Sequence, residues 1–566
     1  MIHFALSNNL ARNVLLASQS NDAVDNAAEA VLSLFGPNAR PAIVRVGQEG
    51  SISDRLLPYH AARMETGYKQ KLQADLKNRM RVAARNLGIS AAASDHLLHI
   101  QQSIRPVWIR YRDLIAVTED GTDNKRSAGL RRTIVRMAGK IGASEPEVQS
   151  AMQDGRLLDA LTQHVASEHS ISNLDIAERF ASIFNLTTDL IGSVSTPERS
   201  FESFLAGTRQ IVAGTCVGLG RTSLGLRKTP FDLVVVDEAA RCTSSELAVP
   251  IQSGRWIVLV GDQAQLEPHH RPEVISEVAA TTGLPKREIV RSDFERIFDS
   301  RYGREAGRKL TQQHRMLAPI GRMVSASFYD GELTHERIDP VIPPKHLPKI
   351  LDRAVTWVAT DNLLLRSFQD PDPSGGSSLV NTVEADAIIK LLKFWDADRS
   401  FRPYLDRTPG STIGIICTYA AQRDLVRHRL RLSGLSETMK SSVTVGTVDS
   451  YQGKQNPIVV LSLVRNNDSG PEEFRQRTIT QGFMIRPNRI NVALSRAMDR
   501  LVIVGARTRW PLAGPMNRVA QAFERELSSN CARLIDVSRL DEWNGSSSPS
   551  RPQGSRGGKP FRGRKR

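Results

Sequence analysis

Cysteine is scarce in this chain of 566 residues, and no metal-binding spacing relates the four that are present. Cys216, Cys242, Cys417 and Cys531 lie far apart, which favours reduced structural thiols over a disulfide framework or a cysteine-based zinc site. No apolar run reaches the length that crosses a bilayer, and the first residues carry no basic leader. We therefore expect a cytoplasmic protein without a membrane partner.

Acidic residues are outnumbered by basic ones. The net charge is +16 and the isoelectric point is about 9.9, which indicates a polyanionic partner, most simply nucleic acid. Seven of the positive charges lie in residues 544–566, a segment rich in Ser, Gly, Pro and Arg that we expect to be disordered and to bind polyanions without sequence preference. Solubility alone is the other interpretation of this charge.

One pair of carboxylates follows a strand that is typical of a buried parallel sheet. Residues 233–236 (LVVV) are four consecutive aliphatic residues, three of them β-branched, which is typical of a strand whose two faces are both covered by helices. Asp237 and Glu238 come directly after it, where open α/β sheets place their ligands. In an ATPase of this layout the first would hold Mg²⁺ and the second would activate the attacking water. A solvated strand end is the alternative.

The same pattern, a buried strand that leads into a polar or small-residue loop, recurs along the chain. Its loops have the sequences QSNDAVD (19–25), GTCVG (214–218), GDQAQLEP (261–268) and GTVDSYQGK (446–454). We therefore predict an α/β protein with a first domain formed by residues 1–46 and 203–300 and a second formed by residues 301–530.

Residues 47–202 break this alternation and predict a helical insertion into the first domain. Apolar residues recur at helical spacing from Leu72 to Leu87, with basic residues around them. Ser144 and Glu147 form a possible capping box that opens another helix. The basic stripes could line a nucleic-acid channel, although a charge run is usually a solvated face.

In order and content, these segments resemble the motifs of superfamily 1 helicases, in the branch that contains the RNA helicase of nonsense-mediated decay and its DNA-directed relatives. The matching segments are residues 19–25 (motif Ia), 214–218 (Ic), 237–240 (II), 261–268 (III), 313–316 (first motif of the second domain), 448–453 (V) and 491–497 (VI). The resemblance covers roughly residues 8 to 46 and 205 to 510. It implies two RecA-like parallel-sheet domains.

The resemblance also implies a role for each matched residue. Asp237 would complete the Mg²⁺ site and Glu238 would be the catalytic base. Gln265 would sense the γ-phosphate of ATP, while Arg315 and Arg496 would act as arginine fingers. The further ATP-binding residues would be Asp262, Gln313, Gln452, Gly453 and Gln455. The residues that contact nucleic acid would be Ser20, Asn21, Thr215, Val217, Thr418, Tyr419 and Thr447.

The sequence departs from the family pattern at two places. Gln455 stands where the family usually has a glutamate that contacts the nucleotide sugar, so we expect a weaker or altered contact. The phosphate-binding loop, Gly-x-x-x-x-Gly-Lys-Ser/Thr, is missing, because none of the three Gly-Lys pairs has the rest of the pattern. We therefore expect that Met1 is internal to a longer protein and that the first sheet lacks its P-loop strand.

The sequence thus predicts an ATP-dependent helicase or translocase on single-stranded DNA or RNA, moving 5′ to 3′ as the resemblance implies. As an isolated chain without its P-loop, it is expected to hydrolyse ATP negligibly. The alternative is a catalytically inactive nucleic-acid-binding protein on a helicase scaffold, which the missing loop and the basic tail favour. Against it stands the full set of Asp237, Glu238, Gln265, Arg315 and Arg496. An unrelated P-loop ATPase would not explain the second α/β unit.

Overall fold

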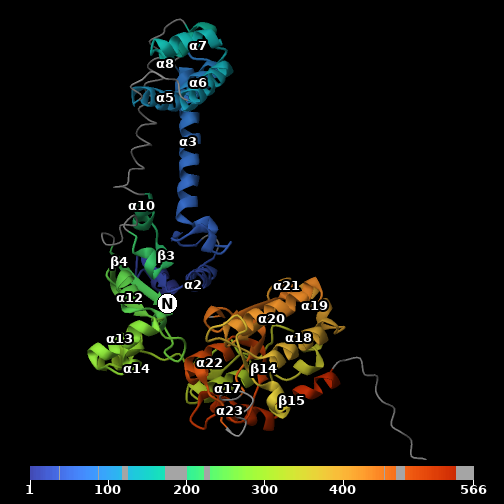
Figure 1. Ribbon diagram of the computed structural model, residues 1–566. Helices are drawn as coiled ribbons and strands as arrows, with labels where there is room; N and C mark the ends of the chain where they lie inside the picture. The colour runs from blue at the N-terminus through green and yellow to red at the C-terminus, as the bar shows by residue number, and fades with distance from the viewer. Residues whose placement is uncertain are drawn as a thin grey trace, which may run out of the picture. The chain divides into compact units, whose positions relative to one another are not determined.

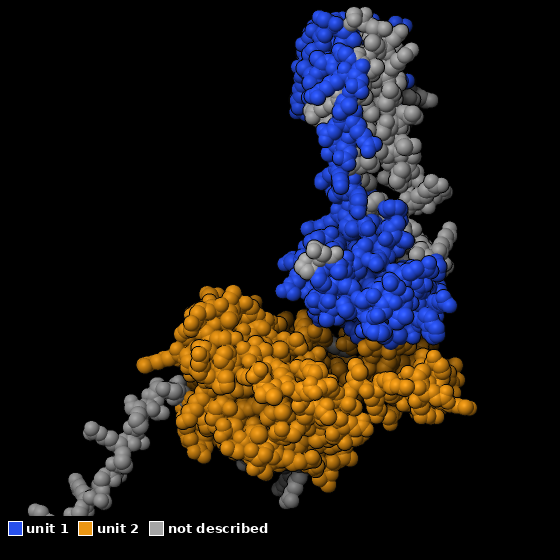
Figure 2. Space-filling model, turned by 180° about the vertical axis from the view of Figure 1, so that it is seen from behind, with its two compact units in different colours: residues 1–237, 245–258 blue, residues 238–244, 259–566 orange. Residues whose placement is uncertain are grey.

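The computed structural model describes residues 1–36, 39–86, 88–117, 125–171, 201–221, 230–451, 453–466 and 478–543 (Figure 1). By internal contacts the chain divides into two compact units, coloured in Figure 2. Unit 1 comprises residues 1–237 and 245–258, and unit 2 comprises residues 238–244 and 259–566. The domain bounds proposed from the sequence differ from this division and stay predictions. Gln452 and the basic tail at 544–566 lie outside the described residues, as do Leu87 and the side chain of Leu72.

Unit 1 is built on a five-stranded sheet with the strand order β2-β3-β1-β4-β5. Its strands are β1 (Val14–Ser18), β2 (Ile43–Arg45), β3 (Ile211–Thr215), β4 (Phe231–Asp237) and β5 (Gly254–Leu259). The ladders that join β1 to β3 and β4, and β2 to β3, are parallel. All five residues of β1 are buried, as the apolar sequence predicts for a strand covered on both faces. Helices of this part include α1 (Ile2–Ser7), α2 (Asn21–Ser33), α10 (Phe201–Thr208), α11 (Cys216–Leu219) and α12 (Ser244–Ile251).

The strand β5 at one edge of this sheet differs from the others in burial. Trp256 is 69% exposed and Ile257 is 41% exposed, although the composition of β5 is that of a buried strand. Apolar edge strands are uncommon in sheets whose other strands are covered. The apolar sequence therefore predicts the strand β5 correctly, but the prediction that this strand is buried is wrong.

A set of helices lies between β2 and β3 in the chain and forms its own core. These are α3 (Ala61–Asn86), the long blue helix of Figure 1, then α4 (Ala91–His99), α5 (Arg105–Val117), α6 (Lys125–Ala138), α7 (Glu145–Gln153) and α8 (Leu157–Glu168), with a π-helical turn at Ile100–Ile104. Ile104, Trp108 and Ile134 are buried together in that core. The capping box of α7 is present, since the Ser144 N–H donates to the Glu147 carboxylate at 3.0 Å.

Unit 2 is built on a six-stranded sheet with the strand order β12-β11-β13-β14-β8-β15, and all its ladders are parallel. The strands are β8 (Val355–Ala359), β11 (Ile413–Cys417), β12 (Val443–Thr447), β13 (Asn456–Ser462), β14 (Ala497–Gly505) and β15 (Ala532–Asp536). Alternate residues of β13 enter two different cores: Val459 and Leu461 pack on one face of the sheet, Ile458 and Val460 on the other. Helices thus cover both faces, and the α/β architecture with two parallel sheets confirms the predicted fold class.

The remaining elements of unit 2 are helices and short paired strands. The helices are α13 (Pro272–Thr282), α14 (Lys286–Val290), α15 (Asp293–Asp299), α16 (Arg301–Ala306), α17 (Ala318–Phe328), α18 (Thr382–Asp396), α19 (Phe401–Arg407), α20 (Ala420–Leu432), α21 (Glu437–Ser442), α22 (Pro487–Leu494) and α23 (Pro515–Ser528). The short strands are β6 (Gln312–Gln313), β7 (Thr334–His335), β9 (Asp370–Pro371) and β10 (Leu379–Val380). Within the described ranges, no helix combines the length and the apolar character that a bilayer crossing requires.

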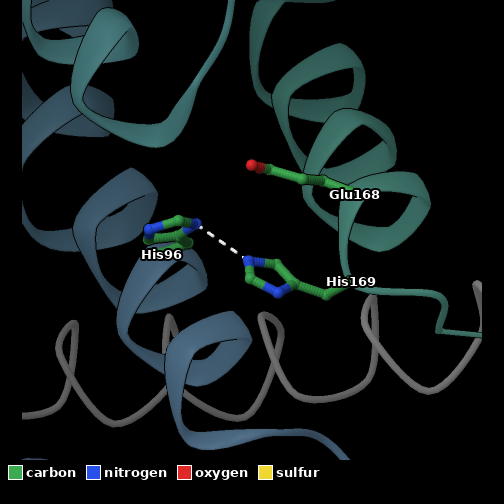
Figure 3. A group of neighbouring side chains, drawn as sticks. All are labelled: His96, Glu168 and His169. Carbon is green, nitrogen blue, oxygen red and sulfur yellow. Dashed lines mark hydrogen bonds between the residues drawn. The ribbon is translucent and has the colours of Figure 1, made fainter.

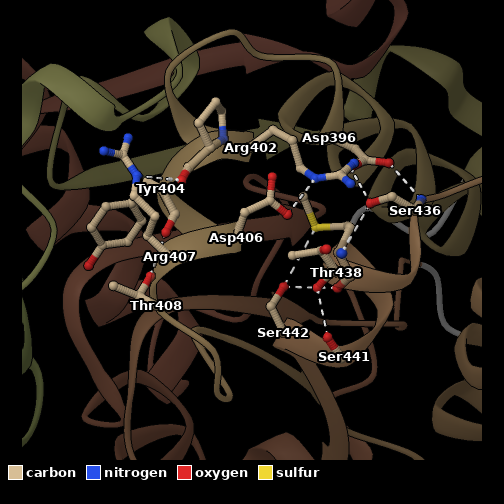
Figure 4. A network of polar contacts seen from close by, with 12 residues as sticks. Asp396, Arg402, Tyr404, Asp406, Arg407, Thr408, Ser436, Thr438, Ser441 and Ser442 are labelled. Carbon is tan, nitrogen blue, oxygen red and sulfur yellow. Dashed lines mark hydrogen bonds and ion pairs between the residues drawn. The ribbon is translucent and has the colours of Figure 1, made fainter.

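Polar bonds join three of these helices at one side of the sheet (Figure 4). Arg402 of α19 donates to Asp396 at the end of α18 at 2.7 Å and to Asp406 at 3.3 Å. Asp396 also accepts from the Ser436 hydroxyl at 2.6 Å, and Ser436 caps α21. The network therefore fixes the ends of α18, α19 and α21 relative to one another.

Glu384 makes the stability of unit 2 depend on pH. It is fully buried in α18, where its carboxyl group accepts from Ser462 Oγ at 2.6 Å and from the Val464 N–H at 2.9 Å. Burial raises its pKa to about 8. The folded protein therefore keeps a proton that the unfolded chain releases above its ordinary carboxyl pKa, and stability decreases as the pH rises from about 4.5 to 8.

We expect Glu384→Gln to remove this pH dependence, because the amide stays neutral throughout. Between pH 5.5 and 7.5 the wild type should lose roughly 2–3 kcal/mol more stability than the variant, measured as unfolding free energies at both pH values. Glu437→Gln is the control, since the Glu437 side chain is 89% exposed and should leave the slope unchanged. Equal slopes for wild type and Glu384→Gln would contradict the assignment.

Candidate functional site

The carboxyl ends of three strands of unit 1 meet at one edge of the sheet. The register aligns Ser18 with Thr215 on one side and with Asp237 on the other. The Ser18 hydroxyl is buried and has no hydrogen-bond partner among the described residues. A carboxylate and an unsatisfied hydroxyl at the same level of a parallel sheet suit a hydrated cation, which prefers oxygen ligands. The donor set at this edge therefore fits the Mg²⁺ that the sequence predicts at Asp237.

The four residues of unit 1 that were predicted to contact nucleic acid follow the same strand ends. Ser20 caps α2 and accepts from the Ala23 N–H at 3.3 Å, and Thr215 caps α11 and accepts from the Gly218 N–H at 3.1 Å. Asn21 lies in the first turn of α2. Val217 is 66% exposed and lines a cavity of about 340 Å³ together with Arg221. Two of the three side-chain hydroxyl or amide groups in this set, those of Ser20 and Thr215, thus already serve as helix caps.

A buried ion pair that the sequence did not predict holds this loop. Arg45 at the end of β2 is fully buried and donates from Nε to Asp25 Oδ1 at 2.6 Å. Its Nη2 donates to Asn21 Oδ1 at 3.0 Å, and Asp25 Oδ2 accepts from the Ser53 N–H at 2.6 Å. A paired and fully hydrogen-bonded charge can be buried, whereas an isolated one cannot. Arg45 therefore orients the amide of Asn21.

In unit 2, the loop after β5 forms a hydrogen-bonded chain with the predicted arginine finger Arg496. Asp262 Oδ1 accepts from the Ala264 N–H at 2.9 Å, and its Oδ2 accepts from Gln265 Nε2 at 2.7 Å. Gln265 Oε1 in turn accepts from Arg496 Nη2 at 2.8 Å. Because the carboxylate takes the amide N–H₂, the amide oxygen of Gln265 has to face the guanidinium. Three residues proposed from the sequence are thus brought together.

Three residues that sequence reasoning missed complete this arrangement. The Tyr329 hydroxyl, just after α17, donates to Asp262 Oδ2 at 2.5 Å. The side chain of Asn491 on α22 donates from Nδ2 to Ala264 O and to the Tyr329 hydroxyl, both at 2.8 Å. Asn488, one turn earlier, donates to Gln265 O at 2.6 Å. Two asparagines three residues apart in α22 are the available signal, while nothing in the sequence marks Tyr329.

The second predicted arginine finger is positioned by its own motif. Gln313 Oε1 accepts from the backbone N–H groups of Arg315 at 3.1 Å and Met316 at 2.8 Å, so its side chain shapes the turn that carries Arg315. Arg315 Nη1 donates to Ser495 O at 3.3 Å, next to Arg496 in the chain. Gln313 was predicted to bind ATP. In this structure its amide oxygen is engaged by the backbone.

The electrostatics of Arg315 and Arg496 differ from those of ordinary surface arginines. Burial, with the positive charge of Arg315 as a further cause, lowers the pKa of Arg496 to about 10, and burial also lowers the pKa of Arg315. The negative charges of Glu238 and Asp262 oppose both shifts. Within the described part of the chain, neither guanidinium forms an ion pair. Two cations held together away from water in this way favour the arrival of an anion.

Glu238 lies at a backbone position that few residues adopt. Its φ is 54°, in the left-handed region, directly after β4 and before a 3₁₀ turn at Ala239–Arg241. Close packing surrounds it, since a Cβ on Gly261 would lie 2.8 Å from Ala240 N. A strained residue at a strand end is a feature of functional sites. With this backbone conformation the chain changes direction at Glu238, directly after the strand that ends at Asp237.

The predicted residues of the middle of unit 2 are divided between buried and accessible positions. Thr418 is buried and donates to Leu463 O at 3.0 Å, and the buried Tyr419 accepts from Arg465 Nε at 2.6 Å. Thr447 is half-buried and ends β12. Gly453 has a left-handed φ of 76°, and Gln455 is exposed. Thr447, Gly453 and Gln455 are thus at least partly accessible to solvent, whereas Thr418 and Tyr419 are buried and contribute to packing.

Comparisons with known proteins give relatives among helicases. Two family models, each described as an AAA domain, match residues 2–271 and 289–508. The chain is 29% identical over 313 residues to Regulator of nonsense transcripts 1 of Dictyostelium discoideum, which covers 54% of this chain and 21% of that protein. It is 28% identical over 311 residues to ATP-dependent helicase NAM7 of Saccharomyces cerevisiae, and the match covers 54% of this chain and 28% of that protein. It is 29% identical over 286 residues to DNA-binding protein SMUBP-2 of Mesocricetus auratus, and the match covers 49% of this chain and 25% of that protein.

The chain spans about a quarter of the length of these curated relatives. Among solved structures, the complex of Arterivirus nonstructural protein 10 (helicase) with DNA is 16% identical and has a TM-score of 0.24, covering 53% of this chain and 43% of that chain. At this score the likeness carries no structural argument.

We expect Asn491→Ala to loosen the link between α22 and the loop of residues 261–268. The change leaves Ala264 O without its amide donor and removes one bond from Tyr329, which should lower the local opening free energy by about 1–3 kcal/mol. Hydrogen exchange with mass spectrometry on peptides from both segments measures this loss. Asn517→Ala is the control, because it removes a single exposed bond to Leu512 O. Unchanged protection in Asn491→Ala would contradict the proposed link.

Proposed function

Because this chain belongs to the superfamily 1 helicases, in the branch of the nonsense-mediated-decay helicase, we propose that it is an ATP-dependent helicase or translocase on single-stranded nucleic acid. One observation carries the proposal. Arg496 is buried and Arg315 is partly buried near it, neither has an ion pair in the described residues, and Arg496 is bonded to Gln265, the residue proposed to sense the γ-phosphate. A transferring phosphoryl group would supply the negative charge that these guanidiniums lack.

The ATP-binding residues divide into four roles. Asp237 would hold the Mg²⁺ of Mg-ATP, an ion that neutralises phosphate charge, and Ser18 offers at the same level a hydroxyl that has no partner in the described part of the chain. Glu238 would orient and deprotonate the attacking water. Arg315 and Arg496 would stabilise the charge that develops on the phosphoryl oxygens. Asp262, Gln313, Gln452, Gly453 and Gln455 would support nucleotide binding.

Gln265 gives the site a way to report whether phosphate is present. Its amide oxygen accepts from Arg496, and its N–H₂ donates to Asp262. When Arg496 turns to a phosphate, Gln265 loses that acceptor role, and the chain of bonds through Asp262, Tyr329 and Asn491 has to change with it. We propose that this is how ATP occupancy reaches α22 and the helices packed on it.

Nucleic acid would be bound at the strand-end loops, through Ser20, Asn21, Thr215 and Val217 of unit 1 and Thr447 of unit 2. The net charge of +16 supports a polyanionic ligand. Thr418 and Tyr419 remain candidates only if their buried hydroxyl groups become accessible. The 5′ to 3′ polarity is taken from the resemblance, and these contacts are with the backbone, so DNA and RNA are both compatible.

The second candidate function is a catalytically inactive nucleic-acid-binding protein. The observation that favours it is the absence of a Gly-x-x-x-x-Gly-Lys-Ser/Thr loop from the 566 residues. Without the lysine and the backbone amides of that loop, the β- and γ-phosphates of ATP lose their main ligands. ATP would then be held mainly by Asp237 with its metal and by the two arginines.

The two functions are separated by the effect of nucleotide on single-strand binding. For a helicase we expect millimolar Mg-ATPγS to change the affinity for a fluorescent single-stranded oligonucleotide several-fold, measured by anisotropy at fixed salt. Arg315→Ala and Arg496→Ala should abolish the change, and hydrolysis by this chain should stay negligible. Arg518→Ala on α23 is the charge-matched control.

Two outcomes would overturn parts of this account. No effect of nucleotide at any concentration would favour the binding protein over the helicase. Rapid hydrolysis stimulated by single strands and abolished by Glu238→Gln would contradict the expectation that the missing loop disables this chain.

A further inference from the structure

Three side chains of metal-ligand type converge in the helical insertion, away from every motif described above (Figure 3). His96 lies on α4, Glu168 is the last residue of α8, and His169 follows it directly. His169 Nε2 and His96 Nδ1 are 3.1 Å apart, and the rings are 5.0 Å apart at an angle of 61°. One ligand atom from each of the three residues lies within 4.8 Å of the others.

The spacing of the two imidazole nitrogens is that of neighbouring ligands on one metal ion. Zinc binds histidine nitrogen at about 2.0–2.1 Å, so a tetrahedral angle puts two such nitrogens about 3.3 Å apart. The observed 3.1 Å needs almost no adjustment. Glu168 is exposed, so its side chain is able to rotate and bring the carboxylate closer, and Figure 3 shows the end of this side chain on the same side of α8 as the two histidine rings.

The surroundings of Glu168 supply an independent observation. His164 is one turn earlier on α8, and its Nε2 is buried without a hydrogen-bond partner among the described residues, 3.9 Å from Glu168 Oε2. Gly142 has a left-handed φ of 82°, and a Cβ there would lie 3.3 Å from Glu168 Oε1. An unsatisfied buried nitrogen next to a metal-type carboxylate is well placed to donate a hydrogen bond to that carboxylate and so to orient it toward a metal ion.

We propose that His96, Glu168 and His169 bind one divalent transition-metal ion of the zinc class, with water as the fourth ligand. Each histidine would bind through the nitrogen that faces the other, with its proton on the far nitrogen, and His164 would donate to the Glu168 carboxylate. Two nitrogens and one carboxylate oxygen suit zinc better than magnesium or calcium, which prefer oxygen alone. Since the two histidines are 73 residues apart, the ion would fasten the end of α8 to α4.

Cobalt and zinc titrations of the metal-stripped full chain test this proposal. Co²⁺ should give the visible absorption of a four-coordinate site, Zn²⁺ should displace it, and elemental analysis should find one tightly held ion per chain. His96→Ala and His169→Ala should each weaken binding by about 100-fold or more, and His164→Ala by about tenfold. His428→Ala is the control, because His428 is exposed on α20 of unit 2.

A second measurement uses the wild-type chain, so its result does not depend on whether the variants fold. In the wild-type chain, Zn²⁺ should protect His96 and His169, but not His428, from modification by diethylpyrocarbonate, read by peptide mass spectrometry. Absence of the cobalt absorption, equal modification with and without zinc, or full affinity in the His96→Ala, His169→Ala double variant would each overturn the site. Full affinity in Glu168→Gln would overturn the three-ligand set.

Discussion

The constraint on which unit 2 depends is the burial of two positive charges beside each other. Burial lowers the pKa of both Arg315 and Arg496, and the charge of Arg315 further disfavours that of Arg496, so the protein must supply compensation. It does so with the carboxylates of Glu238 and Asp262 and with neutral oxygens from Gln265 and Ser495. Such compensation is incomplete without an anion. The tight hydrogen bonding of Asp262, Tyr329 and Asn491 follows from the same need, because acceptors that face a buried guanidinium must be oriented.

In unit 1 the candidate site residues are positioned by the parallel sheet, whose strands end at one edge. A parallel sheet aligns the carboxyl ends of its strands, so Ser18, Thr215 and Asp237 lie at one level without any further interaction. The loops that follow are shaped by helix caps at Ser20 and Thr215 and by the buried Arg45–Asp25 pair. The loop after β1 that was compared with motif Ia is therefore held by a strand end, a cap and an ion pair. None of these needs ligand to form.

Much of the order of the strands along the chain and several of the candidate site residues could be predicted from the sequence, and the failures have physical reasons. Continuous apolar runs such as residues 233–236 and 458–461 indicate strands covered on both faces, which the cores of the two units confirm. The same reasoning misjudged Trp256, because strand order decides which strand is at an edge. Tyr329, Asn491 and Arg45 were missed because their partners lie far away in the chain. The resemblance located Gln265 and Arg496, but only the structure shows the bond between them. Whether the residues assigned to ATP and nucleic acid act as proposed is a question for experiment.

A crystal structure of the chain with Mg-ADP and beryllium fluoride, a mimic of the γ-phosphoryl group, tests the central claim most directly. The account predicts that the fluorides lie within hydrogen-bond distance of both Arg315 and Arg496, and that Arg496 no longer donates to Gln265. A mimic bound elsewhere, with the present bonds from Arg496 to Gln265 and from Arg315 to Ser495 unchanged, would show that the two buried arginines serve the fold and not the phosphoryl group.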